Sequence, residues 1–450
     1  MSRSPARSRL RHARGTALIA AVLLAVLAGM HPDLRFVDFI GFSTRARLLL
    51  EGSDLLNPLY PVGYPTALLV GKGLLGDVLV AGKVLSVLAG AGAVWGVSRW
   101  LSPWAGLWLL CSSAMLTWGT TEGTDMAAAA LSIGGILASR ARPRLAGALL
   151  GAAFLTRYTA IAALPVALLF TRARLGLVGV FAVITAPHWG CALWLGASVL
   201  PDQSSNFAIG GARSGLLSME TLRRLPHGLG RAALAVFELP RAGGGGGPPG
   251  LATMDRAMLL GLAGLFVGLL RRDWRAAALV LLALLHLAGV GMAFVNPRLV
   301  LPATLCVVLG AAWLIPGRLL IPAAALSLWL NLPAAREPSV AASALAKITV
   351  QTDALAGPVL TSSPWFHQRQ EGWIVSGVLL RRLGDARRLD PATLRSRALA
   401  WEVQHVALDI GRVRASYPGL ALLARGKSVA GFTEVAKSPG WRVYRLEPEE

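Results

Sequence analysis

Ten apolar stretches, most of them bounded by arginines, constrain the fold of this 450-residue chain more than any other feature. Their approximate ranges are 15–31, 78–97, 104–118, 124–139, 145–170, 175–200, 256–271, 276–295, 299–315 and 319–333. A helix needs about 20 apolar residues to cross a bilayer, so several would be short or tilted spans. Only 15% of the residues are charged, against roughly a quarter in soluble proteins. The sequence predicts a mainly α, polytopic bundle of about 10 to 11 membrane helices and excludes an ordinary soluble protein.

The distribution of basic residues predicts how this bundle is oriented. If the N-terminus is cytoplasmic, the stretches on that side hold 15 arginines in 39 residues, and the opposite stretches hold 10 Lys or Arg in 113 residues. Cytoplasmic loops carry the excess of Lys and Arg. We expect a basic cytoplasmic N-terminus (1–14), a membrane domain (15–334) with outer loops at 31–77 and 201–255, and an extracytoplasmic C-terminal domain (335–450). The net charge of +21 then reflects membrane orientation, and no nucleic-acid partner is predicted.

One apolar stretch, 145–170, does not fit a single span. Arginine clusters at 140–144 and 172–174 flank it, and both favour the cytoplasmic side. The stretch is therefore predicted to form a broken hairpin with residues 156–158 at its tip. An arginine at membrane depth costs roughly 2.5–3.5 kcal/mol, so Arg157 at this tip should face a partner or a cavity. A buried polar cavity is predicted here.

The residues after about 335 have a composition that suits water. A helix-like segment at 338–347 precedes two candidate buried strands at 358–361 and 403–408. A Ser-Pro-Gly turn between the segments 432–435 and 441–446 indicates a β-hairpin. The sequence predicts a small α/β domain.

Three carboxylates are candidates for chemistry on the outer face. Asp38 is a lone acid in an apolar run, where burial would raise its pKa and suit it to act as a general base. An interfacial helix cap is the structural alternative for Asp38. Glu122 and Asp125 precede a span, where they either complement the helix N-terminus or bind a cation or a sugar hydroxyl. No cofactor is predicted with certainty, and a divalent cation, if used, would be held by Glu122 or Asp125.

Three basic residues are candidates for binding a phosphate. Arg157 and Arg298 can form charge-assisted, often bidentate hydrogen bonds with phosphate oxygens, although Arg298 could also be a simple anchor. Lys83 either adds a third donor or snorkels towards the interface. Tyr60 and Tyr64 lie in a proline-rich loop and serve either as an aromatic belt at the membrane boundary or as a substrate loop.

Several motifs of other enzyme classes are absent from the sequence. It has no Walker loop, no HExxH and no GxSxG. Gly71, Gly73 and Gly76 match a dinucleotide fingerprint by letter, but they lead into a membrane span rather than a βαβ unit. An ATP-driven pump, a nucleotide-sugar enzyme of the Rossmann type and a membrane zinc protease are all disfavoured.

The order of the motifs resembles the GT-C superfamily of integral-membrane glycosyltransferases, especially the branch of protein O-mannosyltransferases and aminoarabinose transferases. The matching pieces are Asp38, the segments 56–65 and 121–125, the broken hairpin around 155–160, and the segment 296–302. The resemblance covers about residues 15–335 and implies a GT-C bundle. Many relatives carry a second acid directly after the first-loop aspartate, whereas Phe39 follows Asp38 here, a departure that bears on metal use.

The resemblance implies an inverting, mannosyltransferase-like reaction. The many Arg, Ala and Gly residues indicate a bacterial source, so the reaction would belong to the bacterial cell envelope. Asp38 would be the base, Glu122 or Asp125 would shape the cavity, and Arg157 and Arg298 would lie near the donor phosphate. The implied donor is a polyprenyl-phosphate sugar at the outer face of the cytoplasmic membrane, and the acceptor hydroxyl belongs to a glycan, a lipid or a protein. The alternatives are a transporter or flippase of a lipid-linked or anionic solute, and an inactive scaffold.

Overall fold

The computed structural model describes residues 5–31, 39–50, 61–194, 219–237, 257–292, 298–336, 359–361, 389–400, 403–438 and 440–447. Two predicted site residues, Asp38 and Tyr60, lie outside these ranges, as does the helix predicted at 338–347. The chain divides into two units. The helical unit comprises Met1–Pro32 with Gly52–Glu337, and the second unit comprises Asp33–Glu51 with Pro338–Glu450.

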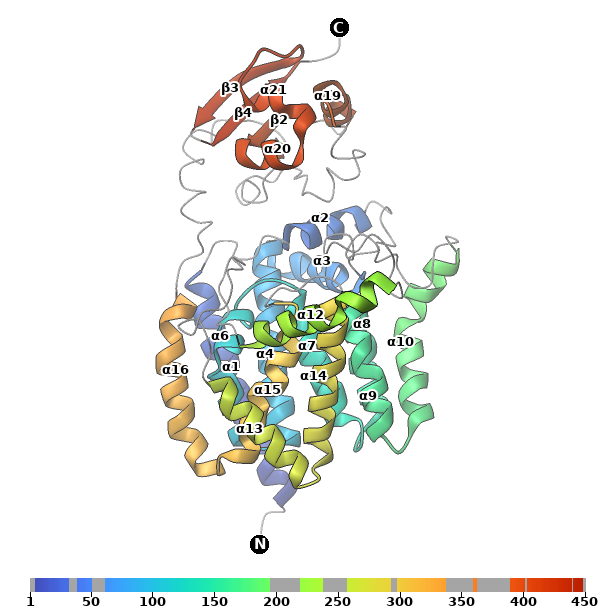
Figure 1. Cartoon of the computed structure of the whole chain (residues 1–450), viewed down its shortest axis with the longest axis vertical. Coiled ribbons are helices and arrows are strands. Elements are labelled where there is room, and N and C mark those ends of the chain that lie inside the picture. The colour runs from blue at the N-terminus through green and yellow to red at the C-terminus, as the bar shows by residue number, and fades with distance from the viewer. Residues whose placement is uncertain are drawn as a thin grey trace. The chain divides into compact units, whose positions relative to one another are not determined.

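The described part of the helical unit is built from helices alone, most of which run along one common direction (Figure 1). They are α1 (Pro5–Gly29), α3 (Gly63–Leu75), α4 (Val78–Trp100), α5 (Pro103–Leu110), α6 (Ser113–Trp118), α7 (Thr124–Ala138), α8 (Pro143–Thr156), the 3₁₀ helix η1 (Tyr158–Ala162), α9 (Ala163–Phe170), α10 (Arg174–Trp194), α12 (Met219–Val236), α13 (Ala257–Leu270), α14 (Trp274–Met292), α15 (Leu301–Leu314), the 3₁₀ helix η3 (Gly317–Leu319) and α16 (Leu320–Arg336).

Four helices among the described residues are long and apolar enough to cross a membrane. Their apolar ranges are Leu10–Gly29, Val78–Trp100, Arg174–Trp194 and Trp274–Gly291. Shorter apolar helices, such as α7, α8 and α15, accompany them. The predicted mainly helical architecture with several apolar helices is confirmed, and the number of complete spans stays a prediction.

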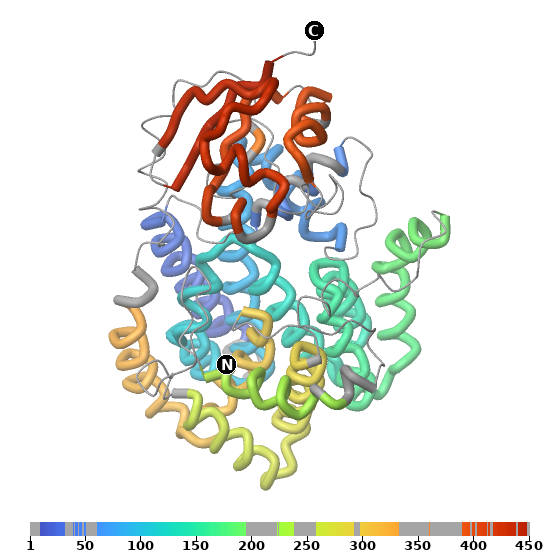
Figure 2. The backbone as a smooth tube through the Cα atoms, turned by 45° about the horizontal axis from the view of Figure 1, so that its top comes forward, coloured from blue at the N-terminus to red at the C-terminus, as the bar shows by residue number. Residues whose placement is uncertain are grey.

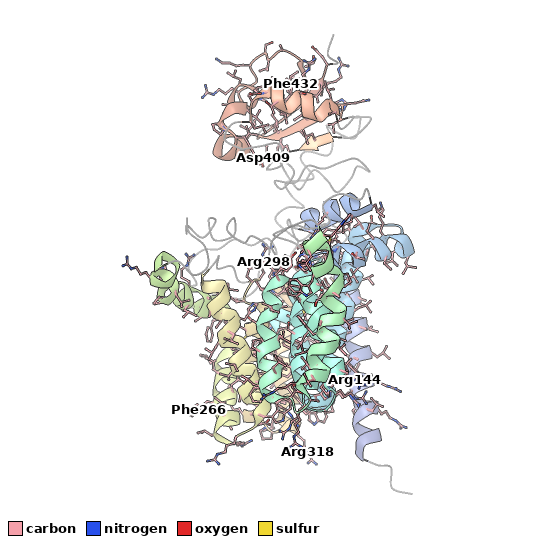
Figure 3. All side chains as sticks on the ribbon, turned by 90° about the vertical axis from the view of Figure 1, so that its right-hand side faces the viewer. Arg144, Phe266, Arg298, Arg318, Asp409 and Phe432 are labelled. Carbon is pink, nitrogen blue, oxygen red and sulfur yellow. The ribbon has the colours of Figure 1, made fainter. Side chains whose placement is uncertain are left out.

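The two ends of the helical unit can be told apart by their arginines. Arg144 and Arg318 lie at one end of the helices and Arg298 lies at the other (Figure 3). We call these the Arg144 end and the Arg298 end. The helix α1 begins at the Arg144 end (Figure 1). Arg144 and Arg318 were both predicted to lie on the side of the N-terminus, and in the structure they lie at the end where α1 begins.

The apolar stretch predicted at 104–118 is two helices rather than one. The helix α5 ends before Cys111, and the Ser112 side chain caps α6 by accepting a hydrogen bond from the Met115 amide at 3.2 Å. The Cys111 carbonyl accepts hydrogen bonds from Ser327 Oγ at 2.9 Å and from Asn331 Nδ2 at 3.4 Å. Both donors lie on α16, so a neighbouring helix satisfies a carbonyl at the break, as an apolar environment requires.

The predicted hairpin broken at Arg157 is confirmed. The helix α8 ends at Thr156, Arg157 has an extended backbone, and the chain continues as η1 and α9. After α9, the Thr171 hydroxyl donates to the Ser139 carbonyl at 2.9 Å. Since Ser139 precedes α8, the chain returns after α9 to the end of the unit where α8 began, and the tip of the hairpin carries Arg157.

The second unit contains a four-stranded sheet in the order β1–β2–β4–β3. Its described elements are α2 (Phe39–Leu50), β1 (Val359–Thr361), α19 (Pro391–Ala400), β2 (His405–Asp409), α20 (Ile410–Ser416), the 3₁₀ helix η6 (Pro418–Leu420), α21 (Ala421–Ala424), β3 (Phe432–Ser438) and β4 (Trp441–Leu446). The predicted hairpin is present as the antiparallel pair β3–β4, whereas β1 runs parallel to β2. Strands and helices of residues 389–447 gather in one body (Figure 2).

Candidate functional site

An ion pair between Asp125 and Arg157 forms the centre of the candidate site. Asp125 lies in the first turn of α7 and Arg157 follows the last residue of α8. The Arg157 guanidinium binds the Asp125 carboxylate and also donates to Thr124 Oγ1 at 3.0 Å. The two side chains are 24% and 5% exposed, respectively. A buried charge needs a partner. The sequence predicted such a partner for Arg157 without identifying it, and the structure shows that it is Asp125.

Glu122 and Tyr64 lie close to this ion pair, and Gly123 connects them: it follows Glu122 in the chain and forms a hydrogen bond with Tyr64. The Gly123 backbone has φ +148°, a conformation that favours glycine, and its amide donates to Tyr64 Oη at 3.0 Å. Glu122, the preceding residue, is completely buried. Burial raises the pKa of Tyr64, and the nearby carboxylates of Glu122 and Asp125 raise it further. Tyr64 is therefore a neutral phenol that positions the turn before α7.

Close packing fixes the helix that carries Tyr64. A Cβ atom added at Gly63 would lie 2.6 Å from the Leu155 carbonyl oxygen, so the start of α3 touches the backbone of the last turn of α8. Tyr64 itself is 2% exposed. Of the proline-rich loop, the described residues from Gly63 onwards thus pack directly against the last turn of α8, and Tyr64 joins the candidate site.

A small cavity adjoins the ion pair and has room for about one water molecule. Its lining includes Asp125, Arg157, Ser132, Thr159 and His286. His286 comes from α14 and donates from Nε2 to the Leu299 carbonyl at 2.6 Å. The cavity therefore brings together a cation, a carboxylate, an imidazole and two hydroxyl-bearing residues.

The sequence alone favours a packing role for a lone histidine in an apolar stretch, such as His286, and the structure places this side chain in the cavity wall. A single histidine in an apolar helix carries no periodic or motif signal, because its significance depends on what α7 and η1 bring opposite to it. The buried polar cavity predicted around Arg157 is present among the described residues.

Arg298 and Lys83 are not among the residues that line the cavity. Arg298 lies at the end of the unit opposite to Arg144 (Figure 3). It directly precedes Leu299, whose carbonyl accepts the hydrogen bond from His286. Lys83 is buried on α4, and its ammonium donates to the His31 carbonyl. Neither residue belongs to the lining of the cavity. Their predicted role as phosphate donors stays a prediction, as do the roles of Asp38 and Tyr60, which lie outside the described residues.

The described part of the chain contains no group of three or more His, Cys, Asp and Glu side chains that could hold a metal ion. Asp125, one of the two predicted metal ligands, is paired with Arg157. The possible cation site at Glu122 or Asp125 therefore stays a prediction.

Comparison with solved structures identifies the architecture. ArnT from Cupriavidus metallidurans bound to undecaprenyl phosphate matches with a TM-score of 0.59 at 15% identity, over 96% of this chain and 98% of that one. The apo state of the same protein matches with a TM-score of 0.57 at 15% identity over the same shares. The chain has the GT-C fold. No protein-family model matches it, and no curated protein matches it significantly.

The resemblance to the GT-C superfamily predicted from the sequence is thus confirmed at the level of the fold. The alignment covers nearly the whole of both chains, so the match extends beyond the apolar helices. Within the GT-C fold, the Asp125–Arg157 pair links the start of α7 to the tip of the broken hairpin.

Proposed function

We propose that this protein is an inverting glycosyltransferase that moves a sugar from a polyprenyl phosphate to an acceptor hydroxyl. The reaction takes place at the outer face of the bacterial cytoplasmic membrane, with the N-terminus cytoplasmic and the C-terminal domain extracytoplasmic. The GT-C fold supports this proposal, and so does the undecaprenyl phosphate bound to the similarly folded ArnT. The acceptor is a glycan, a lipid or a protein.

The observation that carries the proposal is the charged cavity at the tip of the hairpin. Arg157 reaches it from the residue after α8, Asp125 from α7 and His286 from α14. Burying such groups is costly unless they are paired. Apolar side chains could fill the same space without the cost of removing charges from water. The presence of charged groups here therefore favours a ligand site over a purely structural contact.

The proposed reaction is a single displacement. Asp38 accepts the proton of the acceptor hydroxyl as that oxygen attacks the anomeric carbon. The bond between the anomeric carbon and the phosphate oxygen breaks, and the lipid phosphate leaves with the bonding electron pair. Fixed positive charges near the leaving phosphate lower the barrier, because they stabilise negative charge that develops in the transition state.

Arg157, Arg298 and Lys83 are the proposed source of this positive charge. In the described structure Arg157 is bound to Asp125. An incoming phosphate therefore either displaces the Asp125 carboxylate from Arg157 or binds the guanidinium together with it. Glu122 and Asp125 shape the cavity, and Tyr60 and Tyr64 border the path of the substrate. Each of these roles is part of the proposal.

The test is sugar transfer by the full chain reconstituted in liposomes. Radiolabelled polyprenyl-phosphate mannose, glucose and arabinose are supplied with a membrane extract as the acceptor source, and the label is followed into new products. Asp38→Asn should abolish transfer. Asp77→Asn is the matched control, because Asp77 only caps α4 by accepting from the Val80 amide at 2.8 Å and asparagine caps equally well.

Three outcomes count against the proposal. Full activity of Asp38→Asn would remove Asp38 as the base. Movement of a labelled lipid across the bilayer without formation of a new glycosidic product would favour the flippase instead. Loss of activity in both Asp38→Asn and Asp77→Asn, with unchanged membrane insertion, would show that removing any carboxylate from the outer loop inactivates the protein. The loss in Asp38→Asn would then not identify Asp38 as the base.

A further inference from the structure

The helix α12 lies across the Arg298 end of the helical unit, at an angle to the long helices (Figure 1). It packs on α14 through two glycines: a Cβ atom added at Gly228 would lie 2.0 Å from the Gly291 carbonyl oxygen. Gly291 is the last residue of the apolar range Trp274–Gly291 that is long enough to cross a membrane. A membrane span ends at the boundary between lipid and water, so the contact places α12 at the level of this boundary if Trp274–Gly291 is a span.

The two faces of α12 differ in exposure and in chemistry. Gly228, Ala232 and Ala235 are buried. Arg223, His227 and Arg231 are exposed. Residues spaced by four lie on the same face of a helix, so these three side chains form one continuous row, which we call the basic stripe.

The charge of the basic stripe is not neutralised by neighbouring protein groups in the ranges that the structure describes. Neither Arg223 nor Arg231 forms an ion pair there. Along the whole of α12, three arginines stand against a single glutamate. Basic residues at the end of the unit remote from the N-terminus also oppose the general bias of membrane proteins, so their presence calls for a binding partner that carries negative charge.

We infer that the basic stripe binds the phosphate headgroups of anionic phospholipids in the membrane leaflet at the Arg298 end. An amphipathic helix with a basic polar face lies in the plane of the interface and is attracted to anionic lipids. Arginine suits this partner, because its planar guanidinium can donate two parallel hydrogen bonds to a phosphate. The inference concerns bilayer lipids and does not depend on the proposed glycosyl transfer.

The experiment places a photoreactive diazirine amino acid at Leu234 in the full chain. Leu234 is 52% exposed and lies three residues after Arg231, beside the basic stripe. The protein is reconstituted into nanodiscs of equimolar phosphatidylglycerol and phosphatidylcholine, illuminated, and analysed by mass spectrometry for lipid adducts. We expect phosphatidylglycerol adducts to exceed phosphatidylcholine adducts by at least about fivefold.

Three variants localise this preference. Arg223→Gln combined with Arg231→Gln should bring the two adducts close to equal yield, whereas Arg→Lys at both positions should keep most of the excess because the charge remains. The matched control is Arg172→Gln with Arg318→Gln, which removes two other exposed arginines and should leave the adduct ratio unchanged.

The inference fails if the wild type gives equal adducts, if the double glutamine variant keeps the excess, or if the control variant loses it. A second measurement does not depend on the variants. Raising the salt concentration should reduce the excess in the wild type, because exposed charges are screened over about 10 Å at 0.1 M salt. A preference that is insensitive to salt would overturn the electrostatic basis of the inference.

Discussion

Arginines at the two ends of the helical unit have different surroundings. At the Arg144 end, Arg140 and Arg271 are exposed and make peripheral contacts: the Arg140 guanidinium lies 5.7 Å from the centre of the Trp274 ring, and Arg271 Nη1 donates to the Trp313 carbonyl at 3.2 Å. At the tip of the hairpin, Arg157 is largely withdrawn from water and bound to the buried Asp125.

The difference shows that burial, and not residue type, decides what an arginine does here. Exposed charges are well hydrated, so their contacts contribute little to stability, about 0–1 kcal/mol each. A charge at membrane depth loses that hydration and must be compensated by a specific partner. We therefore expect the same substitution to have a large effect at Arg157 and a small effect at the Arg144 end.

The largest expected effect is on catalysis. Arg157→Gln should lower kcat/KM for sugar transfer by roughly 10²–10³-fold, the range found when a group that stabilises developing charge is removed. Arg172→Gln, which removes an exposed arginine beyond the hairpin, should change it by no more than about twofold. Arg157→Lys should recover part of the loss. If Arg157→Gln and Arg172→Gln lower kcat/KM equally, then a buried and an exposed arginine do not differ in their importance for catalysis, and the comparison fails.

The second effect is on stability. Asp125→Asn leaves the Arg157 charge without its counterion and should cost on the order of 3 kcal/mol in the free energy of unfolding. Asp273→Asn tests a carboxylate at the start of α14, which accepts from Trp313 Nε1 at 3.0 Å, and should cost about 1 kcal/mol. Thermal unfolding of the detergent-solubilised protein ranks the two variants.

A double variant sharpens this stability comparison. Asp125→Asn combined with Arg157→Gln should be more stable than Asp125→Asn alone, because removing both charges avoids leaving one of them buried and unpaired. If the two substitutions simply add, then the ion pair contributes no coupling energy and Asp125 does not serve as the counterion of Arg157.

The smallest expected effect concerns the packing behind the site. Gly63→Ala forces the start of α3 away from the Leu155 backbone and should cost roughly 1–3 kcal/mol, with a rise in KM as Tyr64 moves. Gly73→Ala lies on the same helix with no heavy atom within 4 Å of the new Cβ, and should be neutral or slightly stabilising. A neutral Gly63→Ala in both unfolding and kinetic measurements would mean that this close contact does not position Tyr64.

Much of the architecture could be predicted from sequence because it depends on local patterns. Apolar runs of helical length indicate helices in lipid, arginine clusters on both sides of 145–170 require the chain to return to the same end, and a Ser-Pro-Gly turn between apolar runs indicates a hairpin. The break at Arg157 and the β3–β4 pair are both found where these patterns predicted them.

The sequence could not predict which side chains meet. The break between α5 and α6 depends on Ser327 and Asn331 of α16, which bind the Cys111 carbonyl from more than 200 residues away in sequence. The place of His286 in the cavity wall depends on how α14 packs beside η1 and α7. Such contacts leave no spacing or motif in the chain, so His286 looked like any packed histidine.

The sequence by itself determined that this chain forms apolar helices, that its arginines are distributed unevenly between the two sides, and that Arg157 would interrupt a span. These properties follow from hydrophobicity and charge within a few residues of each position. Only the tertiary structure decided that Asp125, 32 residues before Arg157, is its partner and that a cavity opens beside the pair. The physical reason is that a buried charge selects its counterion by proximity in space, which the packing of α7 against α8 creates.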